Sequence, residues 1–395
     1  MSDGCVRIVR LLHFSDMHFS QSQVQSKYLR GALTLGKGIA PNLSARLAQG
    51  LAGHLSGVLK DLRESIVDYV AGYCGGEWSS DTHLLCTGDL TTWGDDPSLA
   101  SALRFISKVH SEAALPTEPI ILYGNHDVWP ERPGHLRGLP FFSTQTALDQ
   151  RRTEMRQQHF SNCSWLRTHL LLPGPPRVGL FSLNTVEHCR YWNTVARGTV
   201  QVDGYWEGTT APEQLEQLED ALRDVDVALV FTHHPVYDDQ YHWVSTSRQS
   251  TNPPPSAVPR SPRPHHPVLG NAPQVSHVLH ATKAPGKSVR FVVSGHTHSV
   301  YPLPGQLPAR GPLNHGFLKG NCGQLTVGTA SQAAVSSAPA VDHSWQALSL
   351  WFDPQQNEVI LERTVFGRQV GNGFAAYGGA PHPMSTAEHL RLSLA

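Results

Sequence analysis

The chain has 395 residues, more than the usual single domain but within reach of a large α/β sandwich with insertions. Hydrophobic residues make up 39% and charged residues 16%, a composition typical of a globular protein with some loose stretches. The 31 basic and 32 acidic residues nearly cancel, so no positive field attracts a nucleic-acid backbone or an anionic membrane. We therefore expect neither nucleic acid nor membrane as a partner.

The first five residues, MSDGC, lack a basic region followed by an apolar stretch, and no run of 18 apolar residues occurs in the chain. We expect a soluble, cytoplasmic protein. The six cysteines are scattered without a C-x-x-C pair, which is typical of reduced thiols rather than a disulfide framework. The 23 histidines are too many to be all functional, so a histidine is a site candidate only where its neighbours also fit.

Five short apolar runs end directly in polar residues that are able to bind metal ions. Runs this short and this rich in Val, Ile, Leu and Phe predict strands buried on both faces. The runs cover residues 6–14, 83–86, 120–123, 227–231 and 289–293. Helical patterns lie between them, over 43–71, over 97–113, and after Thr210, an expected N-cap with Glu213 completing a capping box. The alternation predicts an α/β protein with its chemistry at the carboxyl ends of the strands.

Several segments stand apart from this alternation. Residues 128–165 are long for a connection and carry several aromatic side chains, so we expect either a cap or plain surface packing there. The stretch 246–267 is crowded with Pro, Ser and Arg and predicts a mobile insertion. Residues 345–352 and 358–366 alternate around a turn, which predicts a hairpin that closes a second sheet.

We expect one core domain over residues 1–366. It is followed by a C-terminal tail, 367–395, which is rich in Gly and Ala and shows no pattern that predicts structure or function. No internal repeat is recognisable.

Each of the five predicted strands ends in a motif that contains metal-ligand residues. The motifs are D-M-H at 16–18, G-D at 88–89, G-N-H-D at 124–127, T-H-H-P at 232–235 and G-H-T-H at 295–298. Taken singly, most are as consistent with turns or solvated histidines as with a site. Independent turns do not explain why all five fall in order at strand ends and together supply carboxylate, amide and imidazole groups. The set predicts a pair of adjacent divalent cations. Oxygen and nitrogen donors without thiolate suit manganese, which we expect first, with iron or zinc as alternatives.

These motifs resemble those of the calcineurin-like metallophosphoesterase superfamily, whose pattern D-x-H, G-D, G-N-H-[DE], H and G-H-x-H is matched in full within residues 8–366. The resemblance implies a four-layer α/β/β/α sandwich of two mixed sheets with flanking helices and a dinuclear site at one end. By this similarity one metal ion would be held by Asp16, His18, Asp89 and His298. The other would be held by Asp89, Asn125, His233 and His296, with Asp89 as the bridge.

Two features of the site are less well defined by the resemblance. The family ligand is usually the first histidine after the strand, which favours His233 and leaves His234 a supporting role behind the ligands. Many relatives also have an acidic or asparagine residue shortly after the G-D pair, whereas L-T-T-W follows here at 90–93. The resemblance therefore does not define which residues lie on the substrate side of Asp89.

Two cations roughly 3.5 to 4 Å apart lower the pKa of a shared water and clamp the phosphoryl oxygens of an in-line displacement, so a bridging hydroxide is the expected nucleophile. The chain has no G-x-S-x-G elbow that would offer a serine nucleophile instead. His126 does not fit the ligand count and is the expected acid that protonates the leaving alkoxide. Asp127 would orient its imidazole or raise its pKa.

The expected function is a metal-dependent hydrolase of small phosphate esters, with phosphodiesters favoured and phosphomonoesters as a further class. Two other functions stay open. One is a nuclease for single-stranded nucleic acid, which the near-zero charge and the lack of a basic arm disfavour. The other is a binding scaffold that kept the fold and lost catalysis, against which the intact ligands and His126 speak. The sequence does not predict an oligomeric state.

Overall fold

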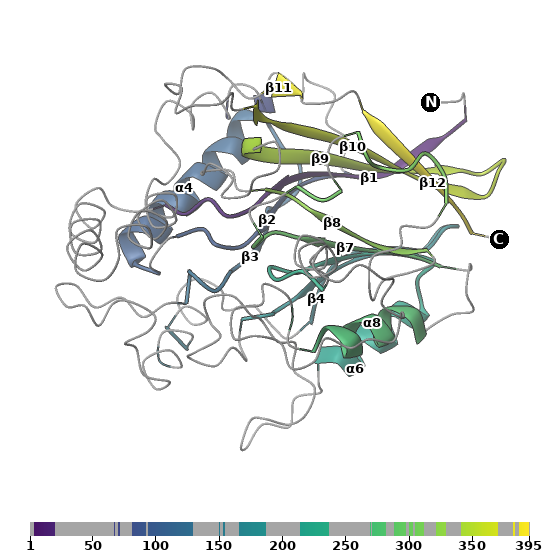
Figure 1. Cartoon of the computed structure of the whole chain (residues 1–395), viewed down its shortest axis with the longest axis horizontal. Coiled ribbons are helices and arrows are strands. Elements are labelled where there is room, and N and C mark those ends of the chain that lie inside the picture. The colour runs from purple at the N-terminus through teal and green to yellow at the C-terminus, as the bar shows by residue number, and fades with distance from the viewer. Residues whose placement is uncertain are drawn as a thin grey trace, which may run out of the picture.

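The computed structural model describes residues 4–19, 67, 70–71, 81–91, 94–128, 150, 153–154, 166–186, 214–236, 269, 271–281, 288–297, 300–302, 305–311, 321–328, 341–369, 382–383 and 387–394. These residues form strands β1 to β12, in two sheets, and helices α4, α6 and α8 (Figure 1). Thr210, Glu213, His298 and the Pro-rich stretch 246–267 lie outside the described residues, as does most of the predicted helix 43–71 and of the predicted cap 128–165.

The first sheet has seven strands in the order β11-β10-β9-β1-β2-β3, with β12 also paired to β10. Its strands are β1 (Val6–Phe14), β2 (Thr82–Thr87), β3 (Ile120–Leu122), β9 (Val341–Asp353), β10 (Glu358–Gln369), β11 (His382–Pro383) and β12 (Glu388–Ser393). β1, β2 and β3 are parallel, and β9 is antiparallel to β1 and to β10, so the sheet is mixed. Phe14 pairs with Cys86 and Cys86 with Ile121, so β1, β2 and β3 end at the same edge.

The second sheet has five strands in the order β4-β5-β6-β7-β8. Its strands are β4 (Leu166–Leu172), β5 (Val178–Leu183), β6 (Val227–Phe231), β7 (Val289–Ser294) and β8 (Cys322–Thr326). Strands β5 to β8 are parallel and β4 is antiparallel to β5, so this sheet is mixed as well. Phe231 pairs with both Ser182 and Val293, so β5, β6 and β7 end together.

The three largest apolar cores among the described residues arise because neighbouring residues of the central strands face opposite sides. Leu12 packs in one core with Leu99 of helix α4 (Asp96–Glu112), while Leu11 points into a second core with Leu229 of the other sheet. Val230 faces a third core under helices α6 (Gln214–Arg223) and α8 (Ala272–Ala281). Figure 1 shows the resulting order of helix, sheet, sheet and helices. The predicted four-layer α/β/β/α sandwich is confirmed.

Helix α4 begins and ends within one residue of the prediction. Oδ1 of its N-cap, Asp95, accepts a 2.8 Å hydrogen bond from the backbone N–H of Ser98. Its buried residues recur at helical spacing and form one apolar stripe: Leu99, Ala102, Phe105, Ile106 and Val109. Among the described residues no helix is long and apolar enough to cross a membrane.

The C-terminal part of the chain differs from the prediction in two ways. The predicted hairpin forms as β9 and β10, but it joins β1 in the first sheet instead of closing a second one. Strand β12, which lies in the predicted tail 367–395, pairs with β10 and places Leu390 opposite Leu361. Both leucines are buried, so this segment contributes to the core between the sheets.

Candidate metal centre

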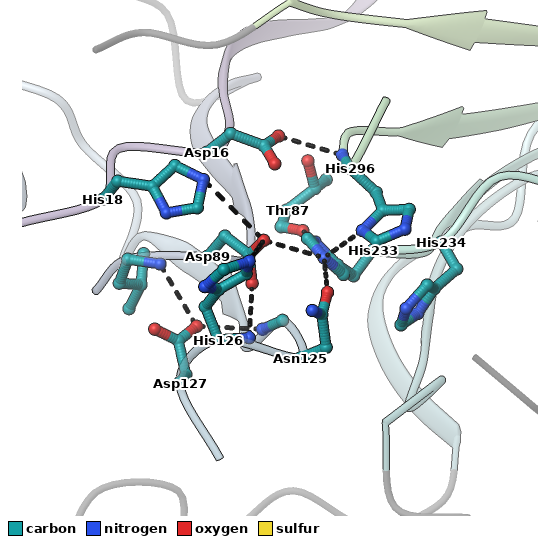
Figure 2. A network of polar contacts seen from close by, with 12 residues as sticks. Asp16, His18, Thr87, Asp89, Asn125, His126, Asp127, His233, His234 and His296 are labelled. Carbon is teal, nitrogen blue, oxygen red and sulfur yellow. Dashed lines mark hydrogen bonds and ion pairs between the residues drawn. The ribbon is translucent and has the colours of Figure 1, made fainter. Parts of the chain in front are cut away.

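The motifs that end β1, β2, β3, β6 and β7 come together at one end of the sandwich, because the parallel strands of each sheet end at the same edge. Figure 2 shows their side chains pointing toward a common centre. These are the side chains of Asp16, His18, Asp89, Asn125, His126, His233 and His296. Of the predicted ligands, only His298 lies outside the described residues.

Asp89 lies at the middle of this arrangement and is almost completely buried. Its Oδ2 is 3.4 Å from Nε2 of His233 and 3.9 Å from Nε2 of both His18 and His126, and it makes no hydrogen bond. Burial alone would raise the pKa of Asp89, but the three imidazoles hold it well below its usual range. Asp89 is therefore an ionised carboxylate with one oxygen directed at a ring of nitrogen atoms.

The orientation of His233 is set by a backbone carbonyl. Its Nδ1 is 2.7 Å from the carbonyl oxygen of Thr87, which can only accept, so Nδ1–H donates and Nε2 faces the centre. Nε2 lies 3.0 Å from Oδ1 of Asn125 and 3.2 Å from Nδ1 of His296. Burial alone would lower the pKa of His233, but the adjacent Asp89 carboxylate, the charge of Asp16 and the hydrogen bond to Thr87 raise it to about 9. A cation bound here would displace that proton.

The side chains form three groups that are able to hold a metal ion, each with ligand atoms within 4.8 Å of one another. The groups are Asp16, Asp89 and His233; His18, Asp89 and His126; and His233, His234 and His296. Asp89 belongs to two of them, as a bridging carboxylate would. The converging carboxylate, amide and imidazole atoms fit divalent cations, and none of these groups contains a thiolate.

Four of these residues adopt a left-handed backbone conformation that residues other than glycine rarely adopt. Asp16, His18, Asp89 and His296 have φ values of 53°, 45°, 49° and 68°. Each such residue costs on the order of 1–3 kcal/mol and persists only where its surroundings enforce it. The N–H of Asp16 donates to the carbonyl of Gly88 at 3.0 Å, and that of His18 donates to the carbonyl of Asp89 at 2.9 Å. The loops after β1 and β2 thus hold each other in place.

Asp127 contacts backbone rather than the imidazole that the sequence analysis expected. Oδ1 accepts from the N–H and the hydroxyl of Thr91 at 2.8 and 3.0 Å, and Oδ2 accepts from the N–H groups of Leu90 and Gly124 at 3.1 and 2.9 Å. Burial and the nearby charge of Asp89 raise the pKa of Asp127 to about 7, against these hydrogen bonds. The carboxylate therefore joins the loop after β2 to the loop after β3.

His126 lies beside the bridging position and is slightly exposed. Its ring packs edge-on against His18, with ring centroids 4.7 Å apart, and 6% of its surface is accessible, whereas Asp16, His18 and Asn125 are at 0%. Its side chain therefore contacts His18 on one side and is accessible to solvent on another.

Two contributors to the site were not found by sequence reasoning. Thr87 supplies the carbonyl that orients His233, and Thr185 lies 3.0 Å from Nδ1 of His234. Thr185 follows β5, a strand that was not predicted. Residues 178–185 nevertheless have the same form as the five predicted strand ends, a buried apolar run that leads into polar residues. That signal would have located the segment.

The fold and this centre define a metal-dependent phosphoesterase, a hydrolase. The sequence model of the family described as calcineurin-like phosphoesterase matches residues 9–300, and the chain belongs to this family. Proteins of this family typically bind two divalent metal ions, in agreement with the ligand groups around Asp89. None of the curated proteins compared with the chain matches it significantly.

Proposed function

We propose that the protein hydrolyses phosphodiester bonds of small molecules, with phosphomonoesters as a second substrate class. The observation that carries this proposal is the placement of Oδ2 of Asp89, 3.4 Å from one imidazole nitrogen and 3.9 Å from two others, without a hydrogen bond of its own. A carboxylate oxygen with these neighbours suits a bridge between two cations.

The proposed metal positions follow the ligand pattern of the family, with Asp89 shared between them. One position would be held by Asp16, His18 and Asp89, together with His298 from outside the described residues. The other would be held by Asp89, Asn125, His233 and His296. Manganese is the first expectation for the native ions, with iron or zinc as alternatives. Bound cations would supply an acidified water as the nucleophile and neutralise the charge on the phosphoryl oxygens.

His126 is the proposed general acid. Its backbone N–H is fixed by Oδ1 of Asp89 at 2.9 Å, which holds the residue beside the proposed bridging carboxylate. Its imidazole is the accessible member of the group that it forms with His18 and Asp89. In this role the ring donates its proton to the leaving alkoxide. Asp127 acts as a positioning residue, since it holds the backbone on both sides of the centre.

A hydrolysis panel tests the proposal. The purified protein is supplied with Mn²⁺, Zn²⁺ or Fe²⁺ and offered nitrophenyl phosphate mono-, di- and triesters, cyclic nucleotides and single-stranded DNA. Selective diester turnover that chelation abolishes is the expected result. Preferred cleavage of DNA with a steep salt dependence would favour a nuclease instead. Metal binding without turnover of any ester would favour a binding scaffold. Asp89→Asn is the matched inactive control.

A further inference from the structure

His234 is a histidine of the centre that does not belong to the ligand set proposed above. It follows His233 at the end of β6 and is completely buried. Its ring lies edge-on to His233, with centroids 4.8 Å apart, and 4.3 Å from the ring of His296. Figure 2 shows His234 on the side of His233 and His296 that faces away from Asp16 and His18. Ligand atoms of the three imidazoles lie within 4.8 Å of one another.

The two ring nitrogens of His234 have very different surroundings. Nδ1 lies 3.0 Å from Oγ1 of Thr185, whereas Nε2 is buried and makes no hydrogen bond. A buried polar atom without a partner costs roughly 1–3 kcal/mol, so such an atom calls for an explanation. One ring nitrogen on a protein oxygen, with the other left without a protein partner beside further imidazoles, is the arrangement that metal-binding histidines show.

We propose that His234 is an additional ligand of the metal position that contains Asn125, His233 and His296. Nδ1–H donates to Thr185, and this hydrogen bond leaves the lone pair of Nε2 for the cation. The inference rests on the proposed metal centre and adds a third imidazole to one of its two positions. Thr185 is then a positioning residue that sets the tautomer and the direction of the ring.

A third imidazole changes which ions the position prefers. Imidazole nitrogen suits zinc, iron and nickel, whereas carboxylate and carbonyl oxygen suit magnesium and manganese. The position that contains His234 would have three imidazoles and one carboxylate, that of the shared Asp89, whereas the position that contains Asp16 and His18 would have two carboxylates, from Asp16 and Asp89. The two positions should therefore differ, and zinc should be held more tightly at the one that contains His234.

Calorimetric titration of the metal-free full-length chain with Zn²⁺, and in parallel with Co²⁺ followed by its visible absorption, tests this assignment. His234→Leu keeps most of the volume of the ring but offers no ligand. We expect it to keep two binding events, to weaken one of them for Zn²⁺ by at least about 10-fold, and to change the Co²⁺ spectrum. His110→Leu is the matched control, because His110 bonds the carbonyl of Thr117 at 2.7 Å outside the centre.

Thr185→Val is the second variant, since it retains His234 and nearly the shape of Thr185 but removes the oxygen that orients the ring. We expect this variant to lose less Zn²⁺ affinity than His234→Leu, at the same binding event. If His234→Leu does not fold, the result for Thr185→Val tests the ligand assignment on its own. Zinc affinities and cobalt spectra that match the wild type in the folded variants would overturn the proposal. Failure of the wild type to hydrolyse esters would overturn the proposed function and leave this ligand assignment standing.

Discussion

The backbone N–H of His126 donates a 2.9 Å hydrogen bond to Oδ1 of Asp89, so one contact ties the proposed acid to the proposed bridging carboxylate. Asp89→Asn keeps an oxygen that can accept this bond but removes the negative charge from the centre. We expect metal content and activity to be lost together, with metal affinity reduced by more than the roughly 10- to 100-fold effect of a supporting hydrogen bond. Metal analysis beside turnover measures both. Full occupancy with normal turnover would contradict the bridge.

The variant His126→Ala tests whether His126 acts as the general acid or as a metal ligand. General acid catalysis contributes about 10²–10⁴-fold, and most for leaving groups that need a proton. The variant should therefore slow alkyl esters by that range, slow nitrophenyl esters far less, and retain its metal. Equal slowing of both ester classes would rule out the acid role. Metal loss would instead identify His126 as a ligand, a possibility raised by its contact group with His18 and Asp89.

Asp127→Asn tests the carboxylate that joins the loops after β2 and β3. The variant has an amide nitrogen in place of one carboxylate oxygen. If it replaces Oδ2, it faces the N–H donors of Leu90 and Gly124, and if it replaces Oδ1, it faces the N–H and the hydroxyl of Thr91. Each buried donor left without an acceptor costs roughly 1–3 kcal/mol, so the free energy of unfolding should fall by about 2–4 kcal/mol. Urea denaturation measures this loss. The control is Asp224→Asn, at an exposed position just after α6, which should change stability by less than about 0.5 kcal/mol.

Gly124→Ala tests how closely the loop after β3 approaches the ligands. A Cβ at this position would overlap Oδ1 of Asp89 and lie 2.6 Å from Cε1 of His233. We expect metal affinity to fall by at least about 10-fold, because both proposed ligands, Asp89 and His233, must shift. Gly174→Ala is the matched control, since a Cβ there meets nothing within 4 Å. Similar metal binding by the two variants would show that the loop yields without moving the ligands.

His13 predicts a dependence of stability on pH. The amide nitrogen of Gln346 lies 2.9 Å from Nδ1 of His13 and can only donate, so the ring proton is on Nε2, 2.8 Å from Oγ1 of Thr87. Burial lowers the pKa of His13 to about 3, against the charge of Asp16. Below about pH 6.5 the unfolded chain binds a proton that the folded chain excludes, so stability should fall as pH drops from about 6.5 toward 3 and be unaffected by His13 above that range.

Urea denaturation of the wild type and of His13→Asn between pH 7.5 and 5 measures this effect. The variant should be less stable than the wild type at pH 7.5. Below pH 6 its free energy of unfolding should fall less steeply than that of the wild type, and the two slopes should differ by up to about 1.4 kcal/mol per pH unit. The other buried histidines titrate in both proteins, so the difference isolates His13. Parallel curves would show that His13 is protonated in the folded chain.

The sequence predicted the strand ends well because the strands that lead to the centre are buried on both faces. β2, β6 and β7 are buried along their whole length, so their apolar runs are continuous and their limits are sharp. Strand β4 alternates weakly at the edge of its sheet, and its run carries Arg167 and His169. Such a strand has no distinct local pattern, which explains why it was not predicted.

Pairing between distant segments could not be predicted from local patterns. The contact of Gln346 with His13 joins residues 333 positions apart and depends on β9 lying beside β1. The same pairing places the C-terminal hairpin in the first sheet. The contacts of Asp127 with two backbone loops were also hidden, because an aspartate next to a histidine suggests a side-chain partner. The residue types of the site were readable from the sequence, whereas their partners required the fold.

The left-handed backbone at Asp16, His18, Asp89 and His296 has a consequence for engineering. Glycine would adopt each of these conformations without strain, so a glycine at any one of them should relieve on the order of 1 kcal/mol or more of backbone energy while it deletes a side chain of the centre. At Asp16 and Asp89 the same change also removes the carboxylate that accepts from the backbone N–H of His296 and of His126, which offsets the gain. The conflict between backbone strain and the proposed metal binding is therefore sharpest at His18 and His296.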